Sequence, residues 1–188
     1  MRTALLLIDI QNDYFPGGAM ELVGADRASV QAASLLAGFR DMAWPVFHVQ
    51  HLSVRPTATF FRPNTPGVDI HSSVLPAAGE AVVTKNFPNS FRDTALLDML
   101  RAADVTRLVI AGMMTHMCVD TSVRAAADLG FACTLAHDAC ATRDLAFGGQ
   151  TVPASAVQAA FMAALNGSFA TVLSAAEACA TLLRPEGA

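Results

Sequence analysis

Cys118 is the residue in this sequence whose type and position most favour nucleophilic chemistry. It lies in a short turn between a buried apolar run at 107–112 and a periodic helix that begins with Val119. A thiol attacks only as its thiolate, and a helix N-terminus beside a cation lowers a thiol pKa to about 3.5 to 7.5. Lys85 could supply that cation, and Asp9 could accept the thiol proton and later return it to a leaving amine. These residues predict a nucleophile, an electrostatic partner and a general acid/base.

Each of these residues also has a structural interpretation. Free cysteines are commonly buried packing residues, an aspartate after a strand is often a loop cap, and a lysine after a strand is usually a solvated charge. Packing is sufficient to explain Cys133 in a strand, Cys140 near a strand end and Cys179 on the last helix. Asp138 and Arg143 are explained equally well as loop caps. From the residues alone, both interpretations of the three residues remain open.

The elements that must position these residues alternate between strands and helices along the whole chain. Short apolar runs predict strands, and apolar residues at intervals of three and four predict helices. The expected strands are 5–8, 45–49, 81–84, 107–112, 131–136 and 169–173, and the expected helices are 26–41, one around 96–100, 119–126, 157–165 and a last one opened by a Ser174–Glu177 capping box. This alternation predicts one domain over 1–188 with a three-layer α/β/α fold and a mostly parallel, roughly six-stranded, doubly wound sheet.

Ligands bind such sheets outside the carboxyl ends of the strands. Asp9, Lys85 and the turn before Cys118 each follow a predicted strand, so we expect the three side chains to converge at one edge of the sheet. The proline-rich segment 52–79 has little periodicity, and long irregular segments in compact domains are often functional. We expect this segment and the loop at 144–153 to set specificity.

Composition restricts the partners. Hydrophobic residues make up 53% of the chain and charged residues 15%, which favours a homo-oligomer, a dimer or larger. The net charge is −4 and no basic run is present, so nucleic acid and anionic membranes are not expected partners, and a small-molecule substrate is. No apolar stretch approaches the roughly 18 residues of a membrane span.

The sequence also bears on location. The apolar run from Ala4 is broken by Asp9, which is typical of a strand rather than a signal peptide. The four cysteines include no CxxC pair, which predicts reduced thiols and a cytoplasmic location.

Three sequence blocks resemble a known family. They are LLLIDIQNDYF around Asp9, VVTKNFPNSF around Lys85 and VIAGMMTHMCVDTSVRAAADLG around Cys118. In this order and spacing they are similar to the isochorismatase-like cysteine hydrolases, which include nicotinamidases and N-carbamoylsarcosine amidase, and the resemblance extends from Leu5 to about Glu177. It implies an Asp-Lys-Cys catalytic triad at the three residues named above.

The resemblance also implies details that composition and periodicity do not reveal. It implies a cis peptide bond between Met113 and Met114, and an oxyanion hole formed by the backbone N–H groups of Met114 and Cys118. The implied chemistry is acyl transfer through a thioester. Four residues next to the motif positions are candidates for the pocket wall: Phe15, Phe91, Thr115 and His116.

The metal ligands of some relatives are only partly present. Metal-dependent nicotinamidases carry Asp-x-His after the second strand, whereas this chain has Gln50 at the apparent carboxylate position. We therefore expect no metal site and no cofactor. Imidazole and carboxylate groups suit several divalent metals, so a different ion or substrate site built from His48, His51, Asp69 and His71 stays open.

The functional hypothesis is a cysteine hydrolase that cleaves a C–N bond of a small non-peptide amide, lactam or ureido compound. True isochorismatases cleave a vinyl ether without needing a thiol, so Cys118 favours amide chemistry. Two alternatives are a non-catalytic member of the fold that senses through a reactive thiol or binds a ligand, and an ether hydrolase of the isochorismatase type.

Overall fold

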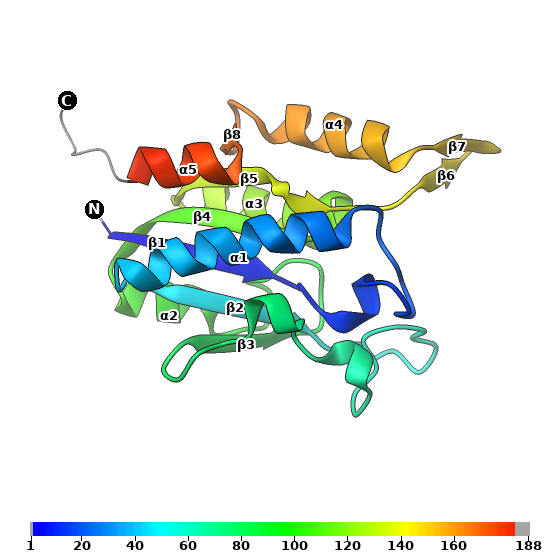
Figure 1. The fold of residues 1–188 in the computed structure, drawn as a ribbon, viewed down its shortest axis with the longest axis horizontal. Helices are drawn as coiled ribbons and strands as arrows, with labels where there is room; N and C mark the ends of the chain where they lie inside the picture. The colour runs from blue at the N-terminus through cyan, green and yellow to red at the C-terminus, as the bar shows by residue number, and fades with distance from the viewer. Residues whose placement is uncertain (1, 183–188) are drawn as a thin grey trace.

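A six-stranded parallel sheet forms the centre of the molecule, as seen in the computed structural model, which describes residues 2–182 (Figure 1). The strand order is β3-β2-β1-β4-β5-β8, and every neighbouring pair is parallel. The strands are β1 (Arg2–Ile8), β2 (Val46–His51), β3 (Ala81–Lys85), β4 (Val105–Met113), β5 (Ala132–Ala141) and β8 (Thr171–Leu173). The three-layer α/β/α prediction is confirmed.

Helices cover both faces of this sheet. They are α1 (Ala25–Asp41), α2 (Leu96–Ala102), α3 (Asp120–Asp128), α4 (Ala154–Leu165) and α5 (Ala175–Leu182). One core cluster contains residues of α1 and α5, and a second contains residues of α2, α3 and α4. Side chains alternate across a strand, so Leu5 and Leu7 of β1 enter the first cluster while Leu6 and Ile8 enter the second. This two-sided burial explains why β1 has a continuous apolar sequence.

The strand β5 is longer than the sequence predicts. Its apolar run ends at Ala136, but the strand continues through His137 and Asp138 to Ala141 after a shift in its register with β4. The polar residue Asp138 within this strand stabilises α5, because its Oδ1 accepts the N–H of Ala175 at 2.7 Å and so caps that helix. The capping box predicted for the same helix is present, with Ser174 and Glu177 bonded in both directions.

Two segments predicted to be irregular contain local structure. The segment 52–79 holds two short 3-10 turns, η2 (Pro66–Val68) and η3 (Ser72–Val74). The loop at 144–153 forms an antiparallel hairpin of β6 (Leu145–Phe147) and β7 (Gln150–Val152) that extends from the body of the molecule (Figure 1). No core pattern marks this hairpin in the sequence, because its residues are largely exposed.

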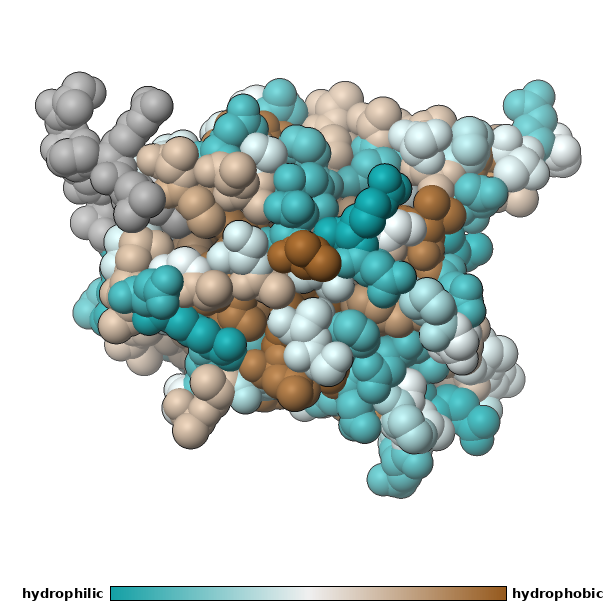
Figure 2. Space-filling view, viewed as in Figure 1, coloured by the Kyte–Doolittle hydropathy of each residue, from teal (hydrophilic) through white to brown (hydrophobic). Residues whose placement is uncertain are grey.

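Apolar side chains also reach the surface. Phe147 in the hairpin is 88% exposed and Val30 on α1 is 62% exposed, and Figure 2 shows hydrophobic residues among hydrophilic ones on one face of the molecule. Scattered apolar residues are normal on soluble proteins, so homo-oligomer formation stays a prediction. Among the residues that the structure describes, no helix combines the length and the apolar character of a membrane span.

Gly112 allows β1 and β4 to approach closely where both strands end. It pairs with Ile8 and has a φ of 145°, a conformation that side chains disfavour. A Cβ atom at this position would overlap the backbone of Ile8. Glycine therefore lets the chain that follows β4 lie beside Asp9, which comes directly after β1.

Candidate active site

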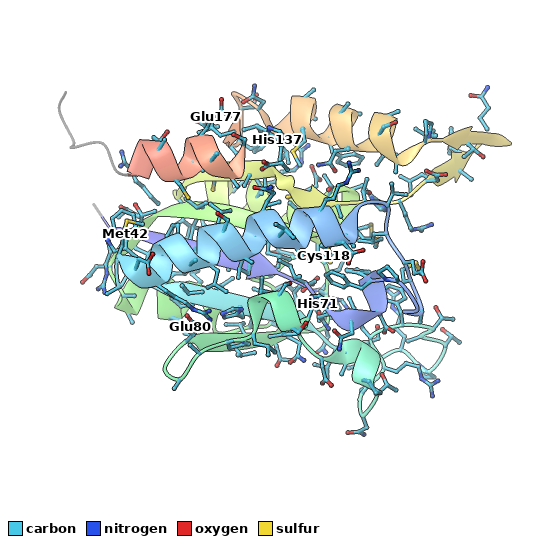
Figure 3. The ribbon with its side chains drawn as sticks, viewed as in Figure 1. Met42, His71, Glu80, Cys118, His137 and Glu177 are labelled. Atoms are coloured by element: carbon cyan, nitrogen blue, oxygen red, sulfur yellow. The ribbon has the colours of Figure 1, made fainter. Side chains whose placement is uncertain are left out.

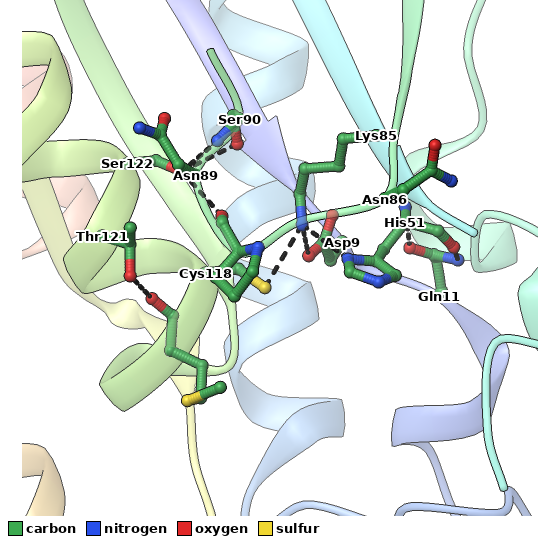
Figure 4. Close-up of polar contacts among 12 residues, drawn as sticks. Asp9, Gln11, His51, Lys85, Asn86, Asn89, Ser90, Cys118, Thr121 and Ser122 are labelled. Carbon is green, nitrogen blue, oxygen red and sulfur yellow. Dashed lines mark hydrogen bonds and ion pairs between the residues drawn. The ribbon is translucent and has the colours of Figure 1, made fainter. Parts of the chain in front are cut away.

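The three predicted catalytic residues meet at the carboxyl ends of the strands. Asp9 follows β1, Lys85 ends β3, and Cys118 lies in the π-helical turn η4 (Thr115–Val119) that joins β4 to α3 (Figures 3 and 4). β1 and β4 are neighbours, and the helices that follow them, α1 and α3, belong to opposite faces of the sheet. This is the switch point at which doubly wound folds bind ligands.

Lys85 bridges the carboxylate and the thiol. Its Nζ lies 2.7 Å from Asp9 Oδ2 and 3.2 Å from Cys118 Sγ. It is the only lysine in the sequence and is 1% exposed. Burial lowers the pKa of Lys85, but the carboxylate of Asp9 and the hydrogen bonds to Asp9 and Cys118 outweigh that effect and hold its pKa above the ordinary value. Lys85 is therefore a buried ammonium group.

The thiol of Cys118 is held in its neutral form, contrary to the expectation of a lowered pKa. Burial raises the pKa of Cys118 most, the carboxylate of Asp9 raises it further, and Lys85 only partly opposes these two effects. Asp9 Oδ1 is buried and has no hydrogen-bond partner among the described residues, so it is available to accept a proton.

His51, which the sequence analysis left as an open candidate for an ion or substrate site, contacts Lys85 directly. His51 ends β2, pairs in register with Lys85 on β3, and accepts a hydrogen bond from its Nζ at Nδ1 over 2.9 Å. Burial and then the charge of Lys85 lower the pKa of His51 to about 4, so its ring is neutral at pH 7. The signal in the sequence was its position two residues after the predicted strand 45–49, which the structure extends to His51.

The other possible ion-binding residues do not join His51. His48 bonds through Nε2 to Glu80 Oε2 at 2.9 Å. Glu80 directly precedes β3, at the amino ends of the strands, whereas Cys118 lies at their carboxyl ends (Figure 3). His71 stacks on Phe15, with ring centroids 3.6 Å apart. Asp69 contributes its backbone oxygen, which accepts the N–H of Asn12.

One further group of side chains has the types and spacing of metal ligands. Ligand atoms of Asp9, His51 and Cys118 all lie within 4.8 Å of one another. The ammonium group of Lys85, however, contacts all three of them. A divalent cation at this point would meet the positive charge of Lys85 at short range, so the geometry favours a resident ammonium group.

The turn η4 is tied to β5 and α4 by two of the predicted pocket residues. Thr115 Oγ1 donates to Gln158 Oε1 at 2.6 Å and lies 3.2 Å from the carbonyl oxygen of Ala141. His116 Nδ1 bonds to Thr142 Oγ1 at 2.6 Å. These contacts place both side chains as anchors of the turn that carries Cys118.

The described ring contacts of the other two predicted pocket residues are with His71 and Phe131. Phe15 is buried in the core cluster of α1 and stacks on His71. Phe91 packs near Phe131, with ring centroids 6.2 Å apart, and Phe131 precedes β5 at the edge of the sheet away from Cys118. Phe91 also packs against the core cluster that contains Cys118. The role of Phe15 and Phe91 in a pocket wall stays a prediction.

Phe61, from the irregular segment 52–79, lies beside His51 and Tyr14. Phe61 is 5.8 Å from the ring of His51 and 4.6 Å from the ring of Tyr14, measured between centroids. Burial raises the pKa of Tyr14 well above its ordinary value, and the charges of Cys118 and Asp9 add to the effect. Sequence analysis predicted a functional segment but did not identify these residues.

The peptide bond between Met113 and Met114 is cis, at the position that the resemblance implies. Met114 directly precedes η4, and its carbonyl oxygen accepts the N–H groups of Met117 and Val119 at 3.1 and 3.3 Å. The oxyanion role of the Met114 and Cys118 N–H groups stays a prediction.

A cavity of about 420 Å³ lies between α1, β5 and α4. Thr142 and Gln158, which anchor η4, contribute to its wall, but Asp9, Lys85 and Cys118 do not. It is therefore distinct from the catalytic cluster.

Comparison with known proteins agrees with this geometry. A family model described as an isochorismatase domain matches residues 3–177. The chain is 52% identical over 172 residues to the uncharacterized isochorismatase family protein YddQ of Bacillus subtilis, covering 92% of this chain and 96% of YddQ. It is 33% identical over 144 residues to the maleamate amidohydrolase of Pseudomonas putida, covering 69% and 68%. A crystal structure from Oleispira antarctica, named as an isochorismatase hydrolase, superimposes with a TM-score of 0.92 at 54% identity, covering 95% and 96%.

Proposed function

Because this chain belongs to the isochorismatase family, which includes amidohydrolases, we propose that it is a cysteine amidase acting on a small non-peptide amide, lactam or ureido compound. The observation that carries the proposal is the buried cluster in which Lys85 Nζ contacts both Asp9 and Cys118. A nucleophile, a carboxylate and a cation in contact are the groups that acyl transfer requires.

The proposed reaction begins with the neutral thiol. Asp9 accepts the proton of Cys118 as Sγ attacks the carbonyl carbon, and the C=O bond becomes an oxyanion that the N–H groups of Met114 and Cys118 stabilise. The C–N bond then breaks, Asp9 gives its proton to the leaving nitrogen, and a thioester remains. Asp9 next takes a proton from water, whose oxygen attacks the thioester, and the departing sulfur recovers that proton.

Lys85 has an electrostatic role in this proposal. Its ammonium group lies 3.2 Å from Sγ, so it stabilises the thiolate that develops during attack. The same charge lies 2.7 Å from Asp9 Oδ2 and limits repulsion between the thiolate and the carboxylate. The raised pKa of Cys118 suits this stepwise chemistry, and it disfavours the alternative of a reactive-thiol sensor, because sensor cysteines have low pKa values.

Arg143 favours substrates with a negative charge. It follows β5 at the catalytic edge, its Nε is buried without a hydrogen-bond partner, and it forms no ion pair with the residues in 2–182. Its charge acts on two groups at the site, since it opposes the rise in the pKa of Tyr14 and adds to the effect of burial in lowering the pKa of His116. Maleamate, the compound in the name of the Pseudomonas putida relative, carries a carboxylate and an amide, so we include it in the first substrates to be assayed.

Ammonia and amine release from a panel of amides tests the proposed function. We expect turnover of at least one compound, its loss in Cys118→Ala, and its retention in Cys179→Ala, which alters a half-buried thiol on α5. Intact-protein mass spectrometry should show an acyl adduct on the wild-type chain during turnover. Activity that survives in Cys118→Ala would exclude the mechanism and favour ether hydrolysis. A panel without any turnover would favour the non-catalytic alternative.

A further inference from the structure

The ammonium group of Lys85 has an acceptor for each of its hydrogens. An ammonium group carries three N–H donors and no acceptor. Lys85 Nζ lies 2.7 Å from Asp9 Oδ2, 2.9 Å from His51 Nδ1 and 3.2 Å from Cys118 Sγ (Figure 4). Because Lys85 is 1% exposed, water is a poor substitute for any of these acceptors. The contact with His51 therefore determines where the other two N–H bonds point.

His51 is itself held in place through its backbone. Gln11 is fully buried, its Oε1 accepts the N–H of His51 at 2.8 Å, and its Nε2 donates to the carbonyl oxygen of His51 at 3.0 Å. The same Nε2 donates to Val68 at 2.7 Å, which links the end of β2 to the irregular segment 52–79. The ring of His51 also lies near Phe61. The backbone of His51 is thus held at the end of β2, in register with Lys85.

We propose that His51 is a positioning residue, which holds the Lys85 ammonium group by accepting its third hydrogen bond and so directs the remaining two toward Asp9 and Cys118. This inference rests on the proposed amidase function for its effect on turnover. The role requires an unprotonated Nδ1, with the ring proton on Nε2. The low pKa of His51 keeps the ring in that neutral form through the neutral range.

Two variants separate the role of an acceptor from that of a packing residue. Asn Oδ1 and His Nδ1 are both bonded to Cγ, so His51→Asn keeps an acceptor at a similar reach, while His51→Leu fills the space without one. An unsatisfied buried donor on a charged group costs enough to predict a loss of about 10- to 100-fold in kcat for His51→Leu. We expect little change in KM, and we expect His51→Asn to recover most of the loss.

A measurement without substrate keeps this inference separate from the proposed function. Because Lys85 is the only lysine, a protein labelled with isotopically enriched lysine gives a single side-chain amine signal, which can be followed through its ε-methylene protons as pH changes. In His51→Leu we expect the amine to lose its proton at a lower pH than in the wild type. In His51→Asn the titration should stay close to that of the wild type.

The outcomes distinguish the two proposals. An unchanged lysine titration in His51→Leu, or equal changes in both variants, would overturn the positioning role even if the protein is an amidase. If His51→Leu does not fold, the nitrogen NMR spectrum of the His51 imidazole in the wild type tests the proposal. A ring proton on Nε2 at pH 7 would support the positioning role, and a proton on Nδ1 would overturn it. If no amide is turned over but the lysine titration shifts only in His51→Leu, the amidase function fails and the positioning role stands.

Discussion

Removing the charge of Lys85 tests whether it compensates the buried carboxylate of Asp9. Both side chains are fully buried, with Nζ and Oδ2 2.7 Å apart. At an effective dielectric constant of about 20, the attraction at this distance is about 6 kcal/mol, part of which offsets the desolvation of the two charges. Breaking such a pair typically costs about 3 to 5 kcal/mol, because one charge is left buried alone. We expect Lys85→Met to lower the free energy of unfolding by that amount.

A double variant isolates the charge effect. Asp9 has a φ of 51°, which asparagine tolerates, so Asp9→Asn preserves the backbone. We expect Asp9→Asn combined with Lys85→Met to recover most of the lost stability, because no buried charge remains.

The assay is urea unfolding followed by the fluorescence of Trp44, the only tryptophan, which packs at 5.6 Å from the ring of Phe39. The expected loss corresponds to about 6 to 20 °C in melting temperature for a chain of this size. Arg92→Met is the control, since Arg92 and Asp93 form an exposed pair 3.6 Å apart that contributes at most about 1 kcal/mol. If Lys85→Met has wild-type stability, or if the double variant is as unstable as the single one, the reasoning is wrong.

Three further predictions concern single residues. Cys118 should react slowly with iodoacetamide at pH 7 and faster as pH rises above 9, because burial and Asp9 raise its pKa, and a rate midpoint below 8 would contradict this. Gly112→Ala should destabilise the fold by about 3 kcal/mol through its clash with Ile8, whereas Gly148→Ala, in open space, should cost about 1 kcal/mol in the same unfolding assay. The hydrogen bond from Arg40 lowers the pKa of Glu80 from 4.5 to about 2, so the stability it contributes is present above pH 4.5 and is lost as pH falls toward 2; acid melting curves of Glu80→Gln should lack that part of the loss.

The local sequence was sufficient to predict a strand where burial of that strand alone determines its apolar pattern. The strands β1 and β4 were predicted because both are buried on two faces and therefore have continuous apolar runs. The second half of β5 was not predicted, since its polar residues serve a neighbouring helix. The hairpin of β6 and β7 was not predicted either, because a largely exposed hairpin has no buried face to impose alternation.

The candidate site was also predicted only in part. Strand ends in the sequence indicated that Asp9, Lys85 and Cys118 lie at one edge of a parallel sheet, and the family resemblance gave them roles. Four other residues next to the motifs are candidates for the pocket wall, and that role stays a prediction. The structure adds their contacts, which link Thr115 and His116 to the turn η4 and Phe15 and Phe91 to other aromatic rings.

The sequence by itself predicted the strands of the central sheet and the helices, and the end of the sheet where Asp9, Lys85 and Cys118 meet, and it indicated Cys118 as the candidate nucleophile. Only the tertiary structure decided that Cys118 rests as a thiol, because desolvation and the charge of Asp9 are sums over all neighbours in space. The third acceptor of Lys85 was likewise decided by strand pairing, which brings His51 to 2.9 Å across a separation of 34 residues. Local patterns report burial and periodicity, whereas pKa values and hydrogen-bond partners depend on distances that exist only in the folded chain.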